Sequence, residues 1–384
     1  MEKSDAKRDV KTNRKLRGEE TLKLLTPFYS KHVEYGATFV DFDGWPFPLK
    51  YKPIEEEINM VRERAGFIDF SANSLLAVVG KDAFTFMQKM LVNDLRRISP
   101  GKMIYSSMMD ETGAIVADTT VLWLEENYFF INGGVFDKQK FMGLLKQNAS
   151  GLEAYIVDTG ACFLAFQGPK TKEILQKAMN VKDMPFFGVK RDNLGDIPVL
   201  VGCAGFTGEL GYEFYVHSSH AIPLWETLVE LGKEYEVGPF GIDATTVMAV
   251  EKGYLIGPDF YEGGTPLEWG LGWTVAFDKD FSGKEVLQKR KSEGIKTKLV
   301  GFEISDPRVV PDTGDRLLKG GDGVGEVTIA TYGNTVGKNI GRGWVNIAYA
   351  DAGEELEVEH ANKRTKVIVS KSYRWYDPEN KLLK

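Results

Sequence analysis

Hydrophobic residues recur at helical spacing along several stretches of the first 240 residues, with polar residues between them, as in helices that bury one face. Glycine, proline, Asp or Asn bounds most of these stretches, and such residues favour helix ends over helix interiors. The pattern predicts helices over residues 21–35, 53–66, 136–147, 170–179 and 220–236, and a further helix that follows Lys81 and Asp82 and leads to Asp94.

Short runs of β-branched and aromatic residues between these stretches predict strands. We expect the strands over residues 37–42, 67–71, 75–79, 105–109, 114–124, 127–133, 154–168 (as two short strands), 199–202 and 212–216. Residues 43–48 are interpreted as a turn, because Pro46 and Pro48 interrupt a regular element.

Helix–strand–strand units recur from about 80 to 135 and from about 170 to 235. This recurrence predicts an α+β fold with internal pseudo-symmetry, and it disfavours a doubly wound parallel sheet. The pattern changes after a junction at residues 278–283, because residues 298–370 consist of short strand-like runs broken by glycine. Such runs are typical of a small barrel or sandwich.

Composition narrows the classes of function. The chain has 384 residues, 43% hydrophobic residues and a formal net charge of −7, with Lys and Arg spread along its length. These values favour a soluble enzyme or binding protein and argue against nucleic acid as the main partner. The two cysteines, Cys162 and Cys203, predict a reducing compartment without a disulfide framework. The four histidines lack the spacing of a structural metal site, so no metal is expected.

Several common motifs are missing from the sequence. No apolar run approaches the ~20 residues of a membrane span, so no membrane association is expected. Residues 1–20 mix basic and acidic side chains, lack a signal-peptide core and are interpreted as a solvated tail of a cytoplasmic protein. The sequence has neither a glycine-rich dinucleotide fingerprint nor a Walker loop.

The most informative stretch for chemistry is residues 84–113. Its apolar helical run stops at Asn93 and Asp94, which favour helix ends, and a predicted strand begins at Tyr105. A carboxylate presented at such a break beside an aromatic strand could bind an amine-containing ring. The alternative is a plain helix cap followed by a hairpin, and these residues alone leave both open.

A set of motifs resembles, in its order along the chain, the glycine-cleavage T-protein (aminomethyltransferase) superfamily. The motifs are LTPFYSKHVEYGATFVDFDGWPFPLKY from residue 25, VNDL from 92, QGP from 167, GFTGELGYEFYV from 205, PLEWGLGWTVAFDKDFSGKE from 266, GEVTIATYGNTVGKNIG from 325 and WYDPEN from 375. The resemblance implies a cloverleaf of two related α/β lobes and a C-terminal small β-barrel domain around a central tetrahydrofolate site. The implied division is a tail at 1–20, a two-lobed folate-binding domain at 21–283 and the barrel domain at 284–384.

The resemblance also implies site residues. Asp94 matches the carboxylate beside the reactive nitrogens of the folate, and Glu209 matches the acid that binds the pterin. Tyr105 and Trp273 match aromatic residues near the ring system. One carboxylate can accept two parallel bonds from a pterin edge, and a flat ring favours aromatic walls. Two alternatives stay open, because Glu209 could pair or cap within its glycine-flanked turn and Trp273 could be a core residue.

Departures from the family pattern bear on the reaction. Arginines of the family motifs are replaced by Cys203, Thr245 and Ala249. The run EKGYLIG from residue 251 instead resembles the folate domains of sarcosine and dimethylglycine enzymes. We therefore expect a tetrahydrofolate-dependent one-carbon transferase of demethylase type. It would transfer a one-carbon (methyl or aminomethyl) unit from a small methylated donor to tetrahydrofolate. The alternatives are a T-protein aminomethyltransferase acting on a lipoylated carrier protein and a non-catalytic folate-binding protein.

Overall fold

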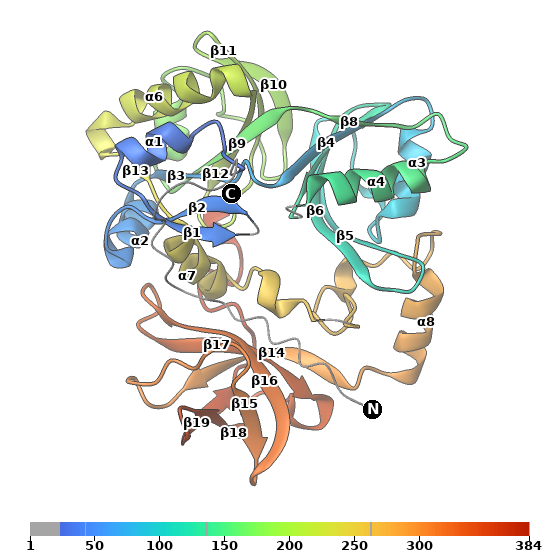
Figure 1. The fold of residues 1–384 in the computed structure, drawn as a ribbon, viewed down its shortest axis with the longest axis vertical. Helices are drawn as coiled ribbons and strands as arrows, with labels where there is room; N and C mark the ends of the chain where they lie inside the picture. Colours follow the sequence, from blue (N-terminus) through green and yellow to red (C-terminus); the bar gives the residue numbers. More distant parts are fainter. Residues whose placement is uncertain (1–23, 43, 135–136, 262, 384) are drawn as a thin grey trace.

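The computed structural model describes residues 24–383, except 43, 135–136 and 262. The tail expected at 1–20 lies outside the described residues. The chain forms two lobes, each built on one sheet, above a C-terminal barrel (Figure 1). No helix among the described residues is long and apolar enough to cross a membrane.

The first lobe contains a six-stranded sheet with the order β10-β11-β12-β9-β3-β13. Its strands are β3 (Gly66–Asp69), β9 (Ala161–Gln167), β10 (Val189–Leu194), β11 (Ile197–Gly202), β12 (Gly211–His217) and β13 (Gly238–Pro239). Its helices are α1 (Tyr29–Glu34), α2 (Ile54–Glu63), α5 (Thr171–Leu175) and α6 (Ala221–Leu231). Trp225 of α6 is buried against Phe67 of β3, with ring centroids 4.6 Å apart.

The second lobe contains a five-stranded sheet with the order β5-β6-β7-β4-β8. Its strands are β4 (Ser74–Val79), β5 (Lys102–Met109), β6 (Ile115–Glu125), β7 (Tyr128–Gly133) and β8 (Tyr155–Asp158), and its helices are α3 (Ala83–Met90) and α4 (Lys138–Asn148). The whole lobe is an insertion, because the chain leaves the first sheet after β3 and returns to it at β9.

The two lobes are structural repeats of one another. The second lobe runs β4-α3-β5-β6-β7-α4-β8, and the first runs β9-α5-β10-β11-β12-α6-β13. The strand orders correspond position by position once β3, which lies between β9 and β13, is set aside. The expected pseudo-symmetry is therefore confirmed, as is the α+β class with two related lobes and a barrel.

The C-terminal part is a closed barrel. Of the two forms predicted for it, the barrel is therefore confirmed and the sandwich is wrong. Its order is β14-β17-β16-β15-β18-β19. The strands are β14 (Thr297–Ile304), β15 (Arg316–Lys319), β16 (Asp322–Gly333), β17 (Lys338–Asn346), β18 (Glu355–His360) and β19 (Lys363–Val369). Helices α7 (Ile242–Lys252) and α8 (Lys284–Glu293) lie in the segment that connects the lobes to the barrel (Figure 1).

Some sequence predictions of local structure were wrong. The turn predicted at 43–48 is largely strand β2 (Trp45–Lys50), which pairs with β1 (Thr38–Phe42) in a two-stranded ribbon. Both strands of a ribbon have a free edge, and edge strands tolerate proline. The helix predicted at 170–179 is regular only in α5. Of the helix predicted at 21–35, residues 21–23 lie outside the described residues, and the described part is regular only in α1. Strand β10 and helices α7 and α8 were not predicted.

Candidate functional site

The two sheets face each other through alternate residues of their strands. In β12, Phe214 packs into the core of the first lobe, whereas Tyr215 packs into an apolar cluster with Leu122 and Phe130 of the second lobe. The rings of Tyr215 and Phe130 have centroids 4.9 Å apart. We call the facing sides of the two sheets the central face. By strand alternation and register, its members include Met103, Tyr105, Asp118, Leu122, Phe130, Asn132, Glu213 and Tyr215.

Polar groups lie within this largely apolar face. Asn132 donates a hydrogen bond to the Tyr215 hydroxyl at 3.0 Å, and that hydroxyl donates to Glu213 at 2.7 Å. Burial raises the pKa of Glu213 to about 7, although the Tyr215 bond opposes the shift. The central face thus contains a carboxyl group that holds its proton near neutral pH.

Asp94 lies where the sequence placed it, just after α3, and it caps the short helix Leu95–Arg97. The residue is 6% exposed. Its Oδ1 accepts bonds from the Gln88 amide at 2.6 Å and from the Arg96 main chain at 2.9 Å. The Arg96 guanidinium donates to both carboxylate oxygens, at 2.8 to 3.1 Å. These bonds from Arg96 hold the pKa of Asp94 well below its usual range, so the group is a fixed negative charge.

Tyr105 and Trp273 lie together, close to Asp94. Their rings are stacked with centroids 6.3 Å apart and an interplanar angle of 25°. The Asn93 side chain, next to Asp94 in sequence, donates to the Tyr105 carbonyl at 2.9 Å. Trp273 is 60% exposed, so the core alternative for this residue is wrong.

The Tyr105 hydroxyl lies against Asp118 of the neighbouring strand. Tyr105 pairs with Thr120 and Ser107 with Asp118, so the two side chains are diagonal neighbours on one face of the sheet. Burial and Asp118 raise the pKa of Tyr105 well above its usual value. Burial raises the pKa of Asp118 to about 6, against the effect of the Tyr105 bond. The Oδ1 atom of Asp118 is buried and has no hydrogen-bond partner among the described residues.

Glu209 lies in the loop between β11 and β12 and is 3% exposed. Gln167 anchors this loop, because its amide donates to the Ala204 carbonyl and accepts from the Thr207 hydroxyl. Arg62 and the Tyr376 hydroxyl donate to Oε1 of Glu209 at 3.0 and 2.5 Å, and no described residue donates to Oε2. The alternative that Glu209 is paired within the protein therefore holds for Oε1 only. Burial raises the pKa of Glu209, and Tyr376 and Arg62 limit the shift.

Arg62 of α2 joins several parts of the molecule at Glu209. Its side chain is 7% exposed and also donates to Glu251 of α7 at 2.7 Å and to the Thr207 carbonyl at 2.7 Å. Its guanidinium lies over the Tyr376 ring, 3.9 Å from the centroid. The C-terminal segment is held here as well, because the Tyr376 main chain donates to the Glu251 carbonyl.

The structure groups the four predicted site residues in two places. Asp94, Tyr105 and Trp273 form one group, and Glu209 belongs to the Arg62 group. The C-terminal segment reaches both groups, since Tyr376 binds Glu209 and Tyr373 lies near enough to add to the raised pKa of Tyr105.

Sequence reasoning missed four residues that lie in these groups or on the central face. Glu213 and Tyr376 lie within the recognised motifs but were not singled out. Asp118 carried a signal that was overlooked, because an acidic residue inside an apolar strand needs a reason. Arg62 carried none, since a charged residue on an amphipathic helix normally faces solvent.

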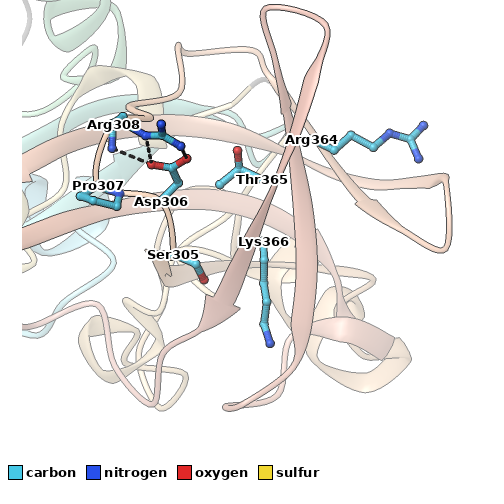
Figure 2. Close-up of a pocket in the computed structure, with 7 residues that line it drawn as sticks. All are labelled: Ser305, Asp306, Pro307, Arg308, Arg364, Thr365 and Lys366. Carbon is cyan, nitrogen blue, oxygen red and sulfur yellow. Dashed lines mark hydrogen bonds and ion pairs between the residues drawn. The ribbon is translucent and has the colours of Figure 1, made fainter.

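Two other features lie on the barrel. A shallow hollow of about 530 Å³ is lined by residues 305–308 and 364–366, where Arg308 is bound by Asp306 (Figure 2). Ligand atoms of Asp312, Asp315 and His360 lie within 4.8 Å of one another, an arrangement that the sequence spacing did not predict. His360 binds Asp315 at 2.7 Å, which accounts for this contact without a metal. Neither feature includes a predicted site residue.

Comparison with known proteins covers nearly the whole chain. The GCVT N-terminal domain family matches residues 28–279, and the glycine cleavage T-protein C-terminal barrel domain family matches residues 297–377. The aminomethyltransferase of Caldanaerobacter subterraneus subsp. tengcongensis is 36% identical over 91% of this chain and 95% of its own length. That of Desulforamulus reducens is 36% identical over 90% and 96%. The crystal structure of glycine cleavage system aminomethyltransferase T from Bartonella henselae has a TM-score of 0.86 at 26% identity, covering 92% of this chain and 98% of that one.

Proposed function

Because this chain is an enzyme of the glycine cleavage T-protein family, we propose that it is a tetrahydrofolate-dependent aminomethyltransferase that takes its one-carbon unit from a lipoylated carrier protein. The observation that carries the proposal is the similarity to aminomethyltransferases along nearly their full length. This replaces the demethylase-type reaction as the first choice, since the relatives named above are aminomethyltransferases.

The residues of the two groups fit a reduced pterin. Glu209 has one oxygen engaged and a second without a donor among the described residues, so it can accept from a ring edge. The buried Oδ1 of Asp118 also lacks a donor. Tyr105 and Trp273 supply aromatic surface for a flat ring. When bound, tetrahydrofolate would supply the nucleophilic nitrogen.

In this proposal Asp94 stabilises positive charge that develops during transfer. A carboxylate held ionised by Arg96 and Gln88 needs no reorganisation when that charge appears, which is the condition for strong electrostatic stabilisation. Asn93 fixes the position of Asp94 relative to Tyr105, because its side chain accepts from the Asp94 main chain and donates to the Tyr105 carbonyl.

A second candidate function is demethylation of a small methylated amine. The observation that favours it is the replacement of the family arginines by Thr245 and Ala249 on α7. Thr245 instead bonds the Gly241 carbonyl within the helix, and the nearby Glu251 is paired with Arg62 of α2.

The two candidates are separated by supplying both donors to the pure protein with tetrahydrofolate. We expect methylene-tetrahydrofolate and ammonia from a lipoylated carrier loaded with an aminomethyl group. Turnover of free sarcosine or dimethylglycine, with no reaction of the loaded carrier, would overturn the proposal in favour of the second candidate. Folate binding without turnover of any donor would identify a binding protein instead.

A further inference from the structure

We propose that Asp118 is the proton-carrying group of this site and that its Oδ1 accepts a hydrogen bond from an amine N–H of the bound reduced pterin. Asp94 then acts only as a fixed charge. The inference rests on the proposed function, because it takes a reduced pterin as the ligand. It assigns a role to a residue that neither the sequence motifs nor the Glu209 group singled out.

The position of Asp118 favours this role. The residue lies on the central face, diagonal to Tyr105, whose ring stacks on the exposed Trp273. Its Oδ1 is buried without a partner among the described residues. An unpaired buried carboxylate oxygen is costly, and a native structure keeps one mainly where a ligand or water supplies the missing donor.

Asp94 is not free to carry this proton. Its Oδ1 already accepts from Gln88 and from both the main chain and the side chain of Arg96, and its Oδ2 accepts from the Arg96 guanidinium. A proton could reach either oxygen only after Arg96 is displaced. Proton transfer therefore needs a different carboxyl group.

The surroundings of Asp118 allow it to exchange a proton. Tyr105 on β5 is the titratable side chain that faces it, and on the β7 side Gly134 donates its main-chain N–H to the Asp118 carbonyl. Burial raises the pKa of Asp118 to about 6, so the group can both take and give a proton near neutral pH. The carboxylate would take the proton that an attacking amine loses as its N–C bond forms. It would return this proton to the amine released as the donor C–N bond breaks. The second N–C bond of methylene-tetrahydrofolate would form as the donor C–S bond breaks, and the proton lost from that second nitrogen would leave with the thiol of the carrier, so each turnover leaves Asp118 unchanged.

Ligand binding tests the proposal without turnover. Affinity for tetrahydrofolate is measured by anaerobic calorimetry between pH 5 and 8. If a pterin N–H binds the carboxylate, the wild-type dissociation constant should rise about tenfold per pH unit below about pH 6. Asp118→Asn should weaken binding about 10- to 100-fold at pH 7 and remove this dependence, because a charged acceptor is lost.

Three further variants make the assignment specific. Asp94→Asn should keep the pH dependence. Glu213→Gln should also keep the pH dependence. The proposal would be overturned if Glu213→Gln lost the pH dependence and Asp118→Asn kept it. Tyr105→Phe removes a donor that favours the charged form, so the midpoint should move to higher pH. An unmoved midpoint would contradict the pairing.

Infrared spectra of the unliganded protein give a second readout. The difference between wild type and Asp118→Asn should contain a protonated carboxyl band that titrates near pH 6. A band absent at pH 5 would show that Asp118 is already ionised and would sink the proposal. If tetrahydrofolate binds to wild type with no pH dependence, the inference fails while the proposed function stands. If no binding occurs at any pH, the proposed function fails too.

Discussion

Three carboxyl groups of the two lobes have different pKa values because their neighbours differ. Asp94 faces a guanidinium and an amide, Asp118 faces one hydroxyl, and Glu213 faces one hydroxyl in an apolar setting. The pKa of Asp94 is lowered, and the pKa values of Asp118 and Glu213 are raised. Desolvation raises the pKa of a carboxyl group that has no cation nearby, whereas a bidentate Arg lowers it.

Asp94→Asn should lower turnover by about 10²–10³-fold, because a preorganised charge is removed from the transferring atoms. Tetrahydrofolate should still bind, as calorimetry can show. The matched control is Asp306→Asn on the barrel, where Arg308 grips Asp306 through the same i, i+2 arrangement. Normal turnover of Asp94→Asn would remove Asp94 from its role.

Glu213→Gln should change how stability depends on pH. Between pH 4.5 and about 7 the folded protein holds a proton on Glu213 that the unfolded chain has lost, so wild-type stability falls as pH rises. The limiting slope is about 1.4 kcal/mol per pH unit. Gln cannot titrate, so the stability of the variant relative to wild type should increase across this window. Urea unfolding at several pH values measures the difference, and parallel curves would contradict it.

The local residue pattern was sufficient to place two of the candidate site residues in the elements where they lie. The break after α3 placed Asp94, and the strand pattern placed Tyr105, because both depend on neighbours in sequence. The Arg62–Glu209 pair joins residues 147 positions apart, so no local pattern could reveal it.

At the scale of elements, most helices and strands followed from periodicity, and the failures have physical causes. Helix α7 was missed because most of its residues are buried, which removes the polar face that defines a helical period. Strand β2 was missed because proline is tolerated on an edge. The helix predicted at 170–179 continues past α5 only as turns.

Gly168 fixes the loop that carries Glu209 against α2. Its N–H donates to the Leu210 carbonyl, its φ is +131°, and a Cβ there would lie 2.5 Å from the Arg64 carbonyl oxygen. Gly168→Ala should therefore cost at least about 2 kcal/mol, from backbone strain and overpacking.

The same substitution should weaken tetrahydrofolate binding, since the loop is displaced from Arg62. Gly160→Ala is the matched control, because its φ is +59° and a Cβ there meets nothing within 4 Å. It should cost only about 1–2 kcal/mol and leave binding unchanged. Chemical denaturation and calorimetry report the two effects, and equal costs at the two glycines would argue against the proposed contact.

At the scale of the whole molecule, one buried network joins the first lobe, α7 and the C-terminal segment. Arg62 contacts all three through Glu209, Glu251 and Tyr376. A second buried pair, Asp259 with Arg342 of β17, ties the connecting segment to the barrel. These contacts could not be predicted from the sequence, because they depend on how the complete lobes pack against each other and against the barrel.

Arg62→Ala should destabilise the protein by about 3–5 kcal/mol, because it leaves Glu209 and Glu251 buried without their cation. Binding of tetrahydrofolate should weaken as well, and Arg62→Lys should restore part of both. The control is Arg191→Ala, an exposed pair with Glu125 that also lies over a Tyr ring and should cost at most about 1 kcal/mol. Similar unfolding free energies for the two alanine variants would refute this role.

The insertion of the second lobe between β3 and β9 sets an order of events during synthesis. Strand β3 leaves the ribosome long before β9. The two strands pair in the folded protein, where Asp69 lies opposite Leu164. The second lobe has all of its strands by residue 158 and can fold on the nascent chain, because domains tend to form as units while translation proceeds. The first lobe is complete only when β13 has been made, and its earliest strand stays unpaired until β9 emerges. The later of the two repeats in sequence is therefore also the one that needs protection from misassembly.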